Sequence, residues 1–152
     1  MGGWRHHLKR VVRNANLTFE HLYTILTMIE ACLNSRPITI LSDHLSDPTP
    51  LTPGHFLIGE PLTAIPEPDI THIKINRLSQ WQRTHQIVQH FWRRWSSEYL
   101  SLLQQRHKWT SIDDNSLQPG QLVIIKDVNL PHLKWSTIII IIMNLHPGAD
   151  GR

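Results

Sequence analysis

The first regular pattern along the chain predicts an amphipathic helix that ends just before Pro37. Thr18 stands where an N-cap is expected, and Glu20 falls in the first turn, where the helix dipole favours an acid. Pro37 lacks an amide hydrogen and disfavours helical geometry at the preceding residue, so the helix ends there. Apolar residues recur at the spacing of one helix face: Leu22, Leu26, Ile29 and Leu33.

A longer periodic stretch, at about residues 78–106, predicts a second helix with one aromatic and one polar face. The aromatic face collects Trp81, Val88, Trp92, Trp95, Tyr99 and Leu102. The polar face collects Gln82, Arg83, Gln86, His90, Arg93 and Arg94. An aromatic stripe on an amphipathic helix is typical of a core or of a contact with a partner helix. Stacking of nucleic-acid bases is the alternative, but stacking platforms lie on exposed surfaces.

The segment 37–76 is rich in proline and shows no sustained period, which predicts a long irregular connection. A connection of this length is usually functional or disordered. Its scattered apolar residues favour a strap laid over the core: Phe56, Leu57, Ile58, Leu62 and Ile65.

After Asn115 the pattern takes the period of strands. Residues 118–120 predict a turn, residues 122–127 a strand, and residues 135–145 a second strand. Two strands alone are marginally stable in water, and the uncharged β-branched run at 138–142 is an aggregation hazard. The predicted fold class is therefore α+β, helical over the N-terminal two-thirds and ending in a β ribbon.

Charge is segregated along the chain, although the formal net charge is only +3. Residues 1–13 carry a net charge of +4, residues 14–76 carry −5, and residues 77–108 carry +5. Residues 5–13 also predict a short helix. Two basic segments around an acidic one favour a polyanionic partner, and a merely solvated basic helix is the alternative. The candidate phosphate-binding residues are Arg5, Lys9, Arg10, Arg13, Arg83, Arg93 and Arg94.

Composition argues against several other classes of function. The single cysteine, Cys32, excludes a disulfide framework and fits a reducing, intracellular compartment. The longest apolar run is too short to cross a bilayer, so no membrane partner is predicted. The eleven histidines lack an i, i+4 pair, and Cys32 has no adjacent base. We therefore predict no catalytic residue, metal site, cofactor or small-molecule ligand.

Five motifs resemble the integrase of Pao/BEL-type LTR retrotransposons. An Asn-x-Arg-Pro at a helix end is followed by a Leu-Thr-Pro and a Phe-Leu-x-Gly, in Cys32-Leu33-Asn34-Ser35-Arg36-Pro37 and in residues 51–59. The resemblance continues in residues 76–83, 89–95 and 130–135. It extends from about residue 7 to residue 151.

The resemblance implies three parts. These are the remnant of a ribonuclease-H-like catalytic core with its strap (1–76), an amphipathic linker helix (77–109) and a truncated, SH3-like C-terminal domain of unknown function (110–152). Such integrases join DNA strands with two metal ions held by two Asp and one Glu. The Glu follows Gly-Gly-Leu-Trp in the relatives, whereas Gly2-Gly3-Trp4 is followed here by Arg5. Both Asp would precede Met1, so we expect no strand transfer.

Two functions stay open at this point. The first is a transposable-element-derived, inactive integrase segment that binds DNA non-specifically in the nucleus through its basic helix faces. The alternative is an interaction or oligomerisation module in which the aromatic face pairs with a second copy or another integrase subunit, and DNA has no role. In either case the helix before Pro37 would lack the sheet of its integrase counterpart. We expect the strap or the aromatic face to cover it.

Overall fold

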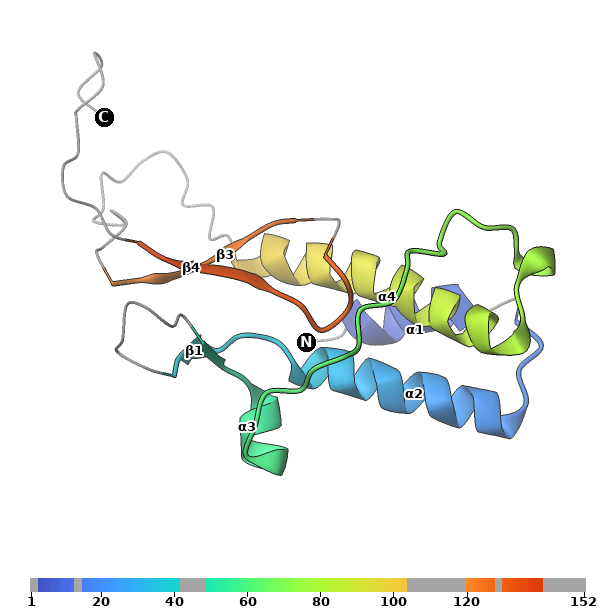
Figure 1. Ribbon diagram of the computed structural model, residues 1–152, viewed down its shortest axis with the longest axis horizontal. Coiled ribbons are helices and arrows are strands. Elements are labelled where there is room, and N and C mark those ends of the chain that lie inside the picture. The colour runs from blue at the N-terminus through green and yellow to red at the C-terminus, as the bar shows by residue number, and fades with distance from the viewer. Residues whose placement is uncertain (1–2, 13–14, 42–48, 104–119, 128–129, 141–152) are drawn as a thin grey trace, which may run out of the picture.

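A computed structural model describes residues 3–12, 15–41, 49–103, 120–127 and 130–140 of the chain (Figure 1). The fold within these ranges is α+β, with a helical N-terminal part as the sequence predicts. The helices are α1 (Gly3–Val12), α2 (Phe19–Asn34), α3 (Pro53–Ile58) and α4 (Gln80–Leu103), with a 3-10 turn η1 (Ile75–Arg77). The strands are β1 (Thr39–Ile40), β2 (Pro50–Leu51), β3 (Leu122–Ile125) and β4 (Ser136–Ile139).

Helix α4 is the central element, and α1 and α2 each lie along it (Figure 1). Helix α2 runs in the same direction as α4, because the start of α4 meets the start of α2 while Tyr99 reaches past the end of α2. There the Tyr99 hydroxyl donates to the carbonyl of Pro37 over 3.0 Å. Helix α1 runs the opposite way, and its His7 contacts Glu98 near the end of α4. The two shorter helices thus flank one long helix.

The core forms where α2 meets the aromatic face of α4. Ile25, Ile29 and Cys32 cluster there with the buried α4 residues Ile87, Val88, Phe91, Trp92 and Trp95. Trp135, just before β4, closes the cluster with its ring centre 4.9 Å from that of Trp92. The prediction that the aromatic face covers the N-terminal helix is confirmed.

The termini of α2 follow from the local sequence. Thr18 is the N-cap, and its hydroxyl accepts a hydrogen bond from the backbone N–H of His21. Hydrogen bonds from the backbone of Glu20 and from Thr18 lower the pKa of the Glu20 carboxyl. The helix stops at Ser35, two residues before Pro37, as predicted.

The predicted apolar face of α2 is wrong by part of a turn. Leu26 was assigned to the core and is 39% exposed, whereas the buried residues are Ile25, Ile29 and Cys32. Both sets have helical spacing, and the periodicity of one helix does not say which of two overlapping stripes meets α4. Cys32 is the last residue of α2 in the core cluster that contains Trp92 and Trp95 of α4.

Helix α4 is buried on more sides than an amphipathic helix would be. Trp81 and Leu102, predicted on the core face, are 60% and 74% exposed, and Gln86, predicted on the polar face, is only 7% exposed. The strap lies on the predicted polar face and buries it there. Trp81 and Leu102 lie near the two ends of α4, outside the core cluster that α2 and α4 form.

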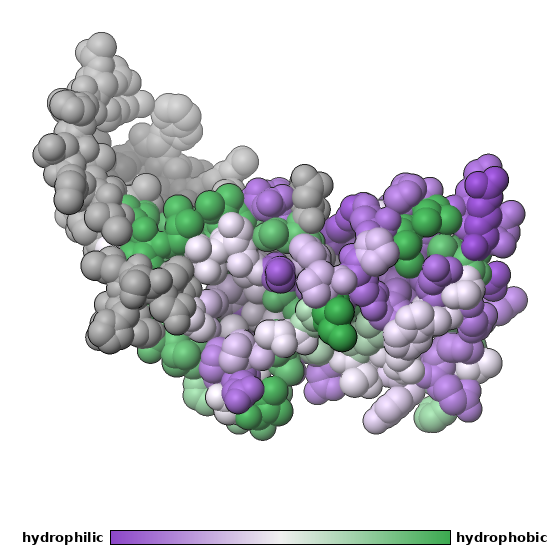
Figure 2. All heavy atoms as spheres, viewed as in Figure 1, coloured by the Kyte–Doolittle hydropathy of each residue, from purple (hydrophilic) through white to green (hydrophobic). Residues whose placement is uncertain are grey.

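The strap is more regular than predicted, and most of the apolar residues that were predicted to cover the core are exposed. Strands β1 and β2 pair antiparallel, and α3 begins with Thr52 and Pro53 and ends at Gly59 in the left-handed conformation (φ 79°). Four of the predicted covering residues are exposed: Phe56, Leu57 and Ile58 of α3, and Ile65. Only Leu62 is half-buried, against Gly54, where a Cβ would lie 3.0 Å from Leu62 Cγ. Figure 2 shows hydrophobic spheres gathered over α3.

The two-stranded C-terminal ribbon is confirmed as far as the described residues go. Strands β3 and β4 pair antiparallel, with Leu122 opposite Ile139 and Ile125 opposite Ser136. The rest of the predicted second strand, residues 141–145, lies outside the described residues. In the described part of the chain, no helix combines the length and apolar character needed to cross a membrane.

Candidate nucleic-acid interface

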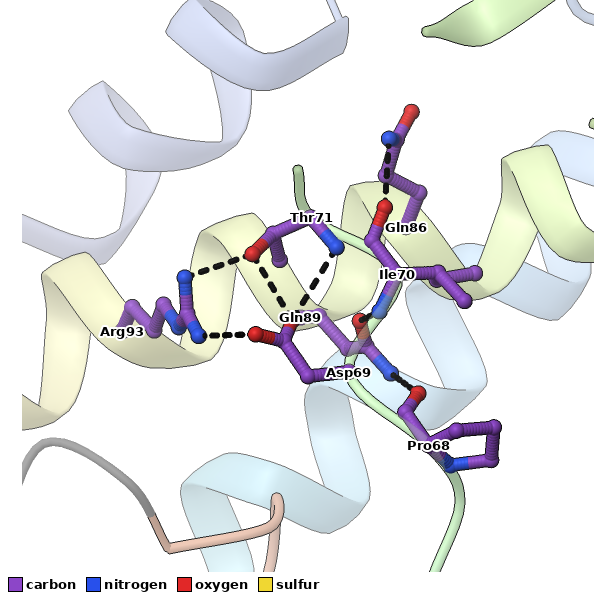
Figure 3. Close-up of polar contacts among 7 residues, drawn as sticks. All are labelled: Pro68, Asp69, Ile70, Thr71, Gln86, Gln89 and Arg93. Atoms are coloured by element: carbon purple, nitrogen blue, oxygen red, sulfur yellow. Dashed lines mark hydrogen bonds and ion pairs between the residues drawn. The ribbon is translucent and has the colours of Figure 1, made fainter. Parts of the chain in front are cut away.

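Two glutamines of α4 hold the strap by its backbone (Figure 3). The Gln86 side-chain amide donates to the carbonyls of Ile70 (2.9 Å) and Ile73 (2.8 Å). Gln89 accepts from the Ile70 N–H (3.1 Å) and donates to the Pro68 carbonyl (3.1 Å). Both glutamines and Ile70 are buried, so the two bonds to Ile70 satisfy backbone groups that water does not reach.

Arg93 extends this contact toward the surface. Its guanidinium donates to Asp69 Oδ2 (2.7 Å) and to the Thr71 hydroxyl (2.5 Å) (Figure 3). The backbone N–H and hydroxyl of Thr71 also bond Asp69, and together with Arg93 they lower the pKa of the Asp69 carboxyl. Arg93 was predicted to bind phosphate, yet its guanidinium already forms an ion pair with Asp69 of the same chain.

Arg83, another predicted phosphate-binding residue, also has a structural role. Its Nε donates to the carbonyls of Ile75 and Leu78, each over 3.2 Å. These carbonyls belong to the η1 turn and its end, so Arg83 fixes the chain where the strap enters α4. Its side chain is half-buried and does not stand free for a ligand.

Three of the predicted cations come together where α1 lies along α4. Arg10 of α1 and Arg93 and Arg94 of α4 line one open depression of about 600 Å³. Its other lining residues are His7, Ser97, Glu98 and Ser101. Within the described ranges, neither Arg10 nor Arg94 has an ion pair or hydrogen bond. His7 contacts Glu98, the acid of this depression.

The electrostatics of this flank favour an anion. His90 lies one turn before Arg94, and burial, followed by the charges of Arg94 and Arg93, lowers the pKa of its imidazole. At neutral pH the imidazole is therefore neutral and does not repel the two guanidinium groups. Ser97 and Ser101 also line the depression, and the Ser101 hydroxyl donates to the carbonyl of Ser97 within α4.

The remaining predicted cations lie apart from this depression. Arg5 and Lys9 are exposed on α1, and the Arg5 guanidinium lies over the ring of Trp4, 5.5 Å from its centre. Arg13 lies outside the described residues. The predicted set therefore divides into three roles: Arg10, Arg93 and Arg94 line the depression, with Arg93 also bound to the strap, Arg83 binds the strap alone, and Arg5 and Lys9 are exposed.

The side chains with metal-binding or nucleophilic chemistry are scattered over the part of the chain that the structure describes. In the described ranges, no three His, Cys, Asp or Glu side chains are grouped to hold a metal ion. Burial raises the pKa of the Cys32 thiol to about 12, so the thiol is a core residue and a poor nucleophile.

The aromatic face of α4 is not a surface. Trp92 and Trp95 are buried among α2, Trp135 and Tyr99. A partner helix or a nucleic-acid base would have to displace these residues to reach them. Trp81 is the exposed indole of the helix, and its ring lies 4.1 Å from that of His85.

Sequence reasoning missed the residues that join the strap to α4. The signals were two glutamines spaced by three in an otherwise apolar stretch, and the Asp69-x-Thr71 turn. Glutamine at such a position reads equally well as a solvated residue. Only the placement of the strap on that face shows the difference.

Comparison with known proteins gives one match. The model of a family of unknown function (DUF5641) matches residues 79–152, which begin one residue before α4. None of the curated proteins matches the chain, and neither does any solved structure.

A buried histidine cluster gives a pH prediction. His132 is buried, and His85 Nδ1 lies 2.5 Å from Glu67 Oε2 beside it. Burial chiefly, and His85 secondarily, lower the pKa of His132, while Glu67 opposes them. The unfolded chain therefore takes up the proton first, so stability is fully present above the unfolded pKa of about 6.5 and falls as the pH drops below it.

We expect urea unfolding to show lower stability at mildly acidic pH than at neutral pH. His132→Gln should reduce this difference, because it removes one group that binds a proton more readily when unfolded. An unchanged pH dependence in His132→Gln would contradict the assignment.

Proposed function

We propose that this chain binds nucleic acid without sequence preference, through the basic surface formed by Arg10, Arg93 and Arg94. The observation that carries the proposal is the convergence of Arg10 from α1 and Arg94 from α4 in one depression. Arg and Lys that neutralise phosphates give affinity without reading bases. The described lining of the depression contains no Trp, Tyr or Phe on which bases could stack, which fits contact with the phosphate backbone of the nucleic acid.

We further propose that the chain derives from an integrase of the Pao/BEL type and acts by binding rather than by strand transfer, with the nucleus as its place of action. The resemblance described above supports the origin. The sequence supports binding in place of strand transfer, because Gly2-Gly3-Trp4 is followed by Arg5 where the resemblance places the segment with the catalytic Glu. Metal-dependent joining of DNA ends by the purified chain would contradict this proposal.

The binding proposal predicts that Arg10→Ala combined with Arg94→Ala weakens duplex DNA binding by about 10- to 100-fold near 0.1 M salt, since each lost phosphate contact removes the release of about one counterion. Fluorescence anisotropy with a labelled duplex of arbitrary sequence measures it. Lys74→Ala combined with Lys134→Ala is the matched control, because both lysines are exposed and the loss of charge is the same. Equal weakening by the two pairs would show that net charge, not this surface, governs binding.

A further inference from the structure

An apolar groove lies between α1 and α2, and one of its lining residues, Arg10, also lines the depression described above. Its volume is about 880 Å³, and its apolar residues are Leu8 and Val12 from α1 and Leu22 from α2. All three are half-buried. The polar members are His6, Lys9 and Arg10, all from α1. The groove therefore has an apolar floor and a basic rim.

The outward face of α2 has the complementary character. Phe19, Tyr23 and Leu26 recur at the spacing of one helix face, and their side chains are 78%, 66% and 39% exposed. The rings of Phe19 and Tyr23 stack on each other. This stripe is interleaved with Glu20 and Glu30, both exposed, and α2 contains no Lys or Arg. Helix α1, in contrast, carries Arg, Lys and no acid.

We propose that two copies of this chain associate about a two-fold axis, with the outward face of α2 in each copy seated in the α1–α2 groove of the other. Helix α2 supplies Leu22 to the groove and Phe19 and Tyr23 to the face beside it. One helix thus contributes to both halves of the contact, as a self-complementary interface requires.

Charge complementarity selects a second copy as the occupant. The two-fold arrangement places the basic α1 of one copy over the acidic α2 of the other, twice. Glu20 and Glu30 then face Lys9 and Arg10 across the rim, while the aromatic residues leave water. A further helix in the groove would also complete a bundle, because α1 and α2 each pack on α4. This inference shares Arg10 with the nucleic-acid proposal but does not rest on it, because the apolar residues of the groove lie outside the depression.

Sedimentation of the nuclease-treated full chain over a range of concentrations tests the proposal. We expect a reversible monomer–dimer equilibrium that weakens at high salt. Phe19→Ser combined with Tyr23→Ser should weaken the dimer roughly 30-fold or more, as loss of interface hot spots does. Both side chains are exposed, so folding, followed by circular dichroism, should be retained.

The matched control is Phe56→Ser combined with Leu57→Ser on α3, where the two side chains are 74% and 63% exposed. This pair should leave the dimer unchanged. Lys9→Glu with Arg10→Glu should weaken the dimer, and added Glu20→Lys with Glu30→Lys should restore it. A monomer at all concentrations would overturn the proposal, as would a dimer that the α2 pair does not affect, equal loss with the α3 pair, or no rescue by the charge exchange.

Discussion

Replacement of Trp92 by alanine is expected to lower the free energy of unfolding by about 3–5 kcal/mol, as loss of a large buried aromatic does. Trp92 is 4% exposed and contacts both Trp95 and Trp135. Because domains are stable by only about 5–15 kcal/mol, much of the folded population should be lost. Urea unfolding followed by circular dichroism measures the change.

Trp81→Ala is the matched control, since it removes the same side chain from the same helix at a position that is 60% exposed. Its effect should be about 1 kcal/mol or less, from the contact with His85. Comparable losses in the two variants would mean that the aromatic core is not where the structure places it. A wild-type chain without a cooperative transition would mean that α1, α2 and α4 do not form a complete core.

The second large effect is expected at the contact between the strap and α4. Gln86→Ala combined with Gln89→Ala leaves the buried Ile70 N–H without its partner and removes the amide donors to the carbonyls of Pro68, Ile70 and Ile73. Each buried unsatisfied group costs about 1–3 kcal/mol. The strap should then separate from α4 and become open to protease between residues 61 and 78. Limited proteolysis, with the cleavage sites read by mass spectrometry, detects this opening.

Gln80→Ala serves as the control for the glutamine pair, because Gln80 is exposed and its contact with His21 is at the surface. It should leave protection of the strap unchanged. Protection that survives the Gln86 and Gln89 exchange would show that Asp69 and Arg93 hold the strap without the glutamines.

Local signals in the sequence predict the helices well. Thr18 and Pro37 mark the ends of α2, and the long period at 78–106 marks α4 to within a few residues. Helix α3 also has start and stop residues, Thr52-Pro53 and Gly59. The proline content of the segment nevertheless favours an irregular connection. A turn-rich composition hides a six-residue helix, because six residues are too few to establish a period.

The arrangement of the elements is less predictable, because it depends on contacts far apart in the sequence. Leu26 and Ile25 are equally apolar, and only the position of α4 decides which is buried. Gln86 and Arg93 look like solvated residues until the strap, about twenty residues earlier, lies on them. Arg10 and Arg94 line one depression although no local pattern relates their segments. The sequence therefore predicts the cations but not which of them line the surface and which bind the strap.

The slope of DNA affinity against salt concentration is the most direct measure of the proposed function. With about three phosphates neutralised by Arg10, Arg93 and Arg94, the affinity of the wild-type chain should fall roughly 40-fold between 50 and 200 mM salt. Removal of Arg10 and Arg94 should lower the log–log slope by about 1.8, the share of two phosphates. A wild-type affinity that does not change with salt, or a slope that the double variant leaves intact, would contradict nucleic-acid binding at this surface.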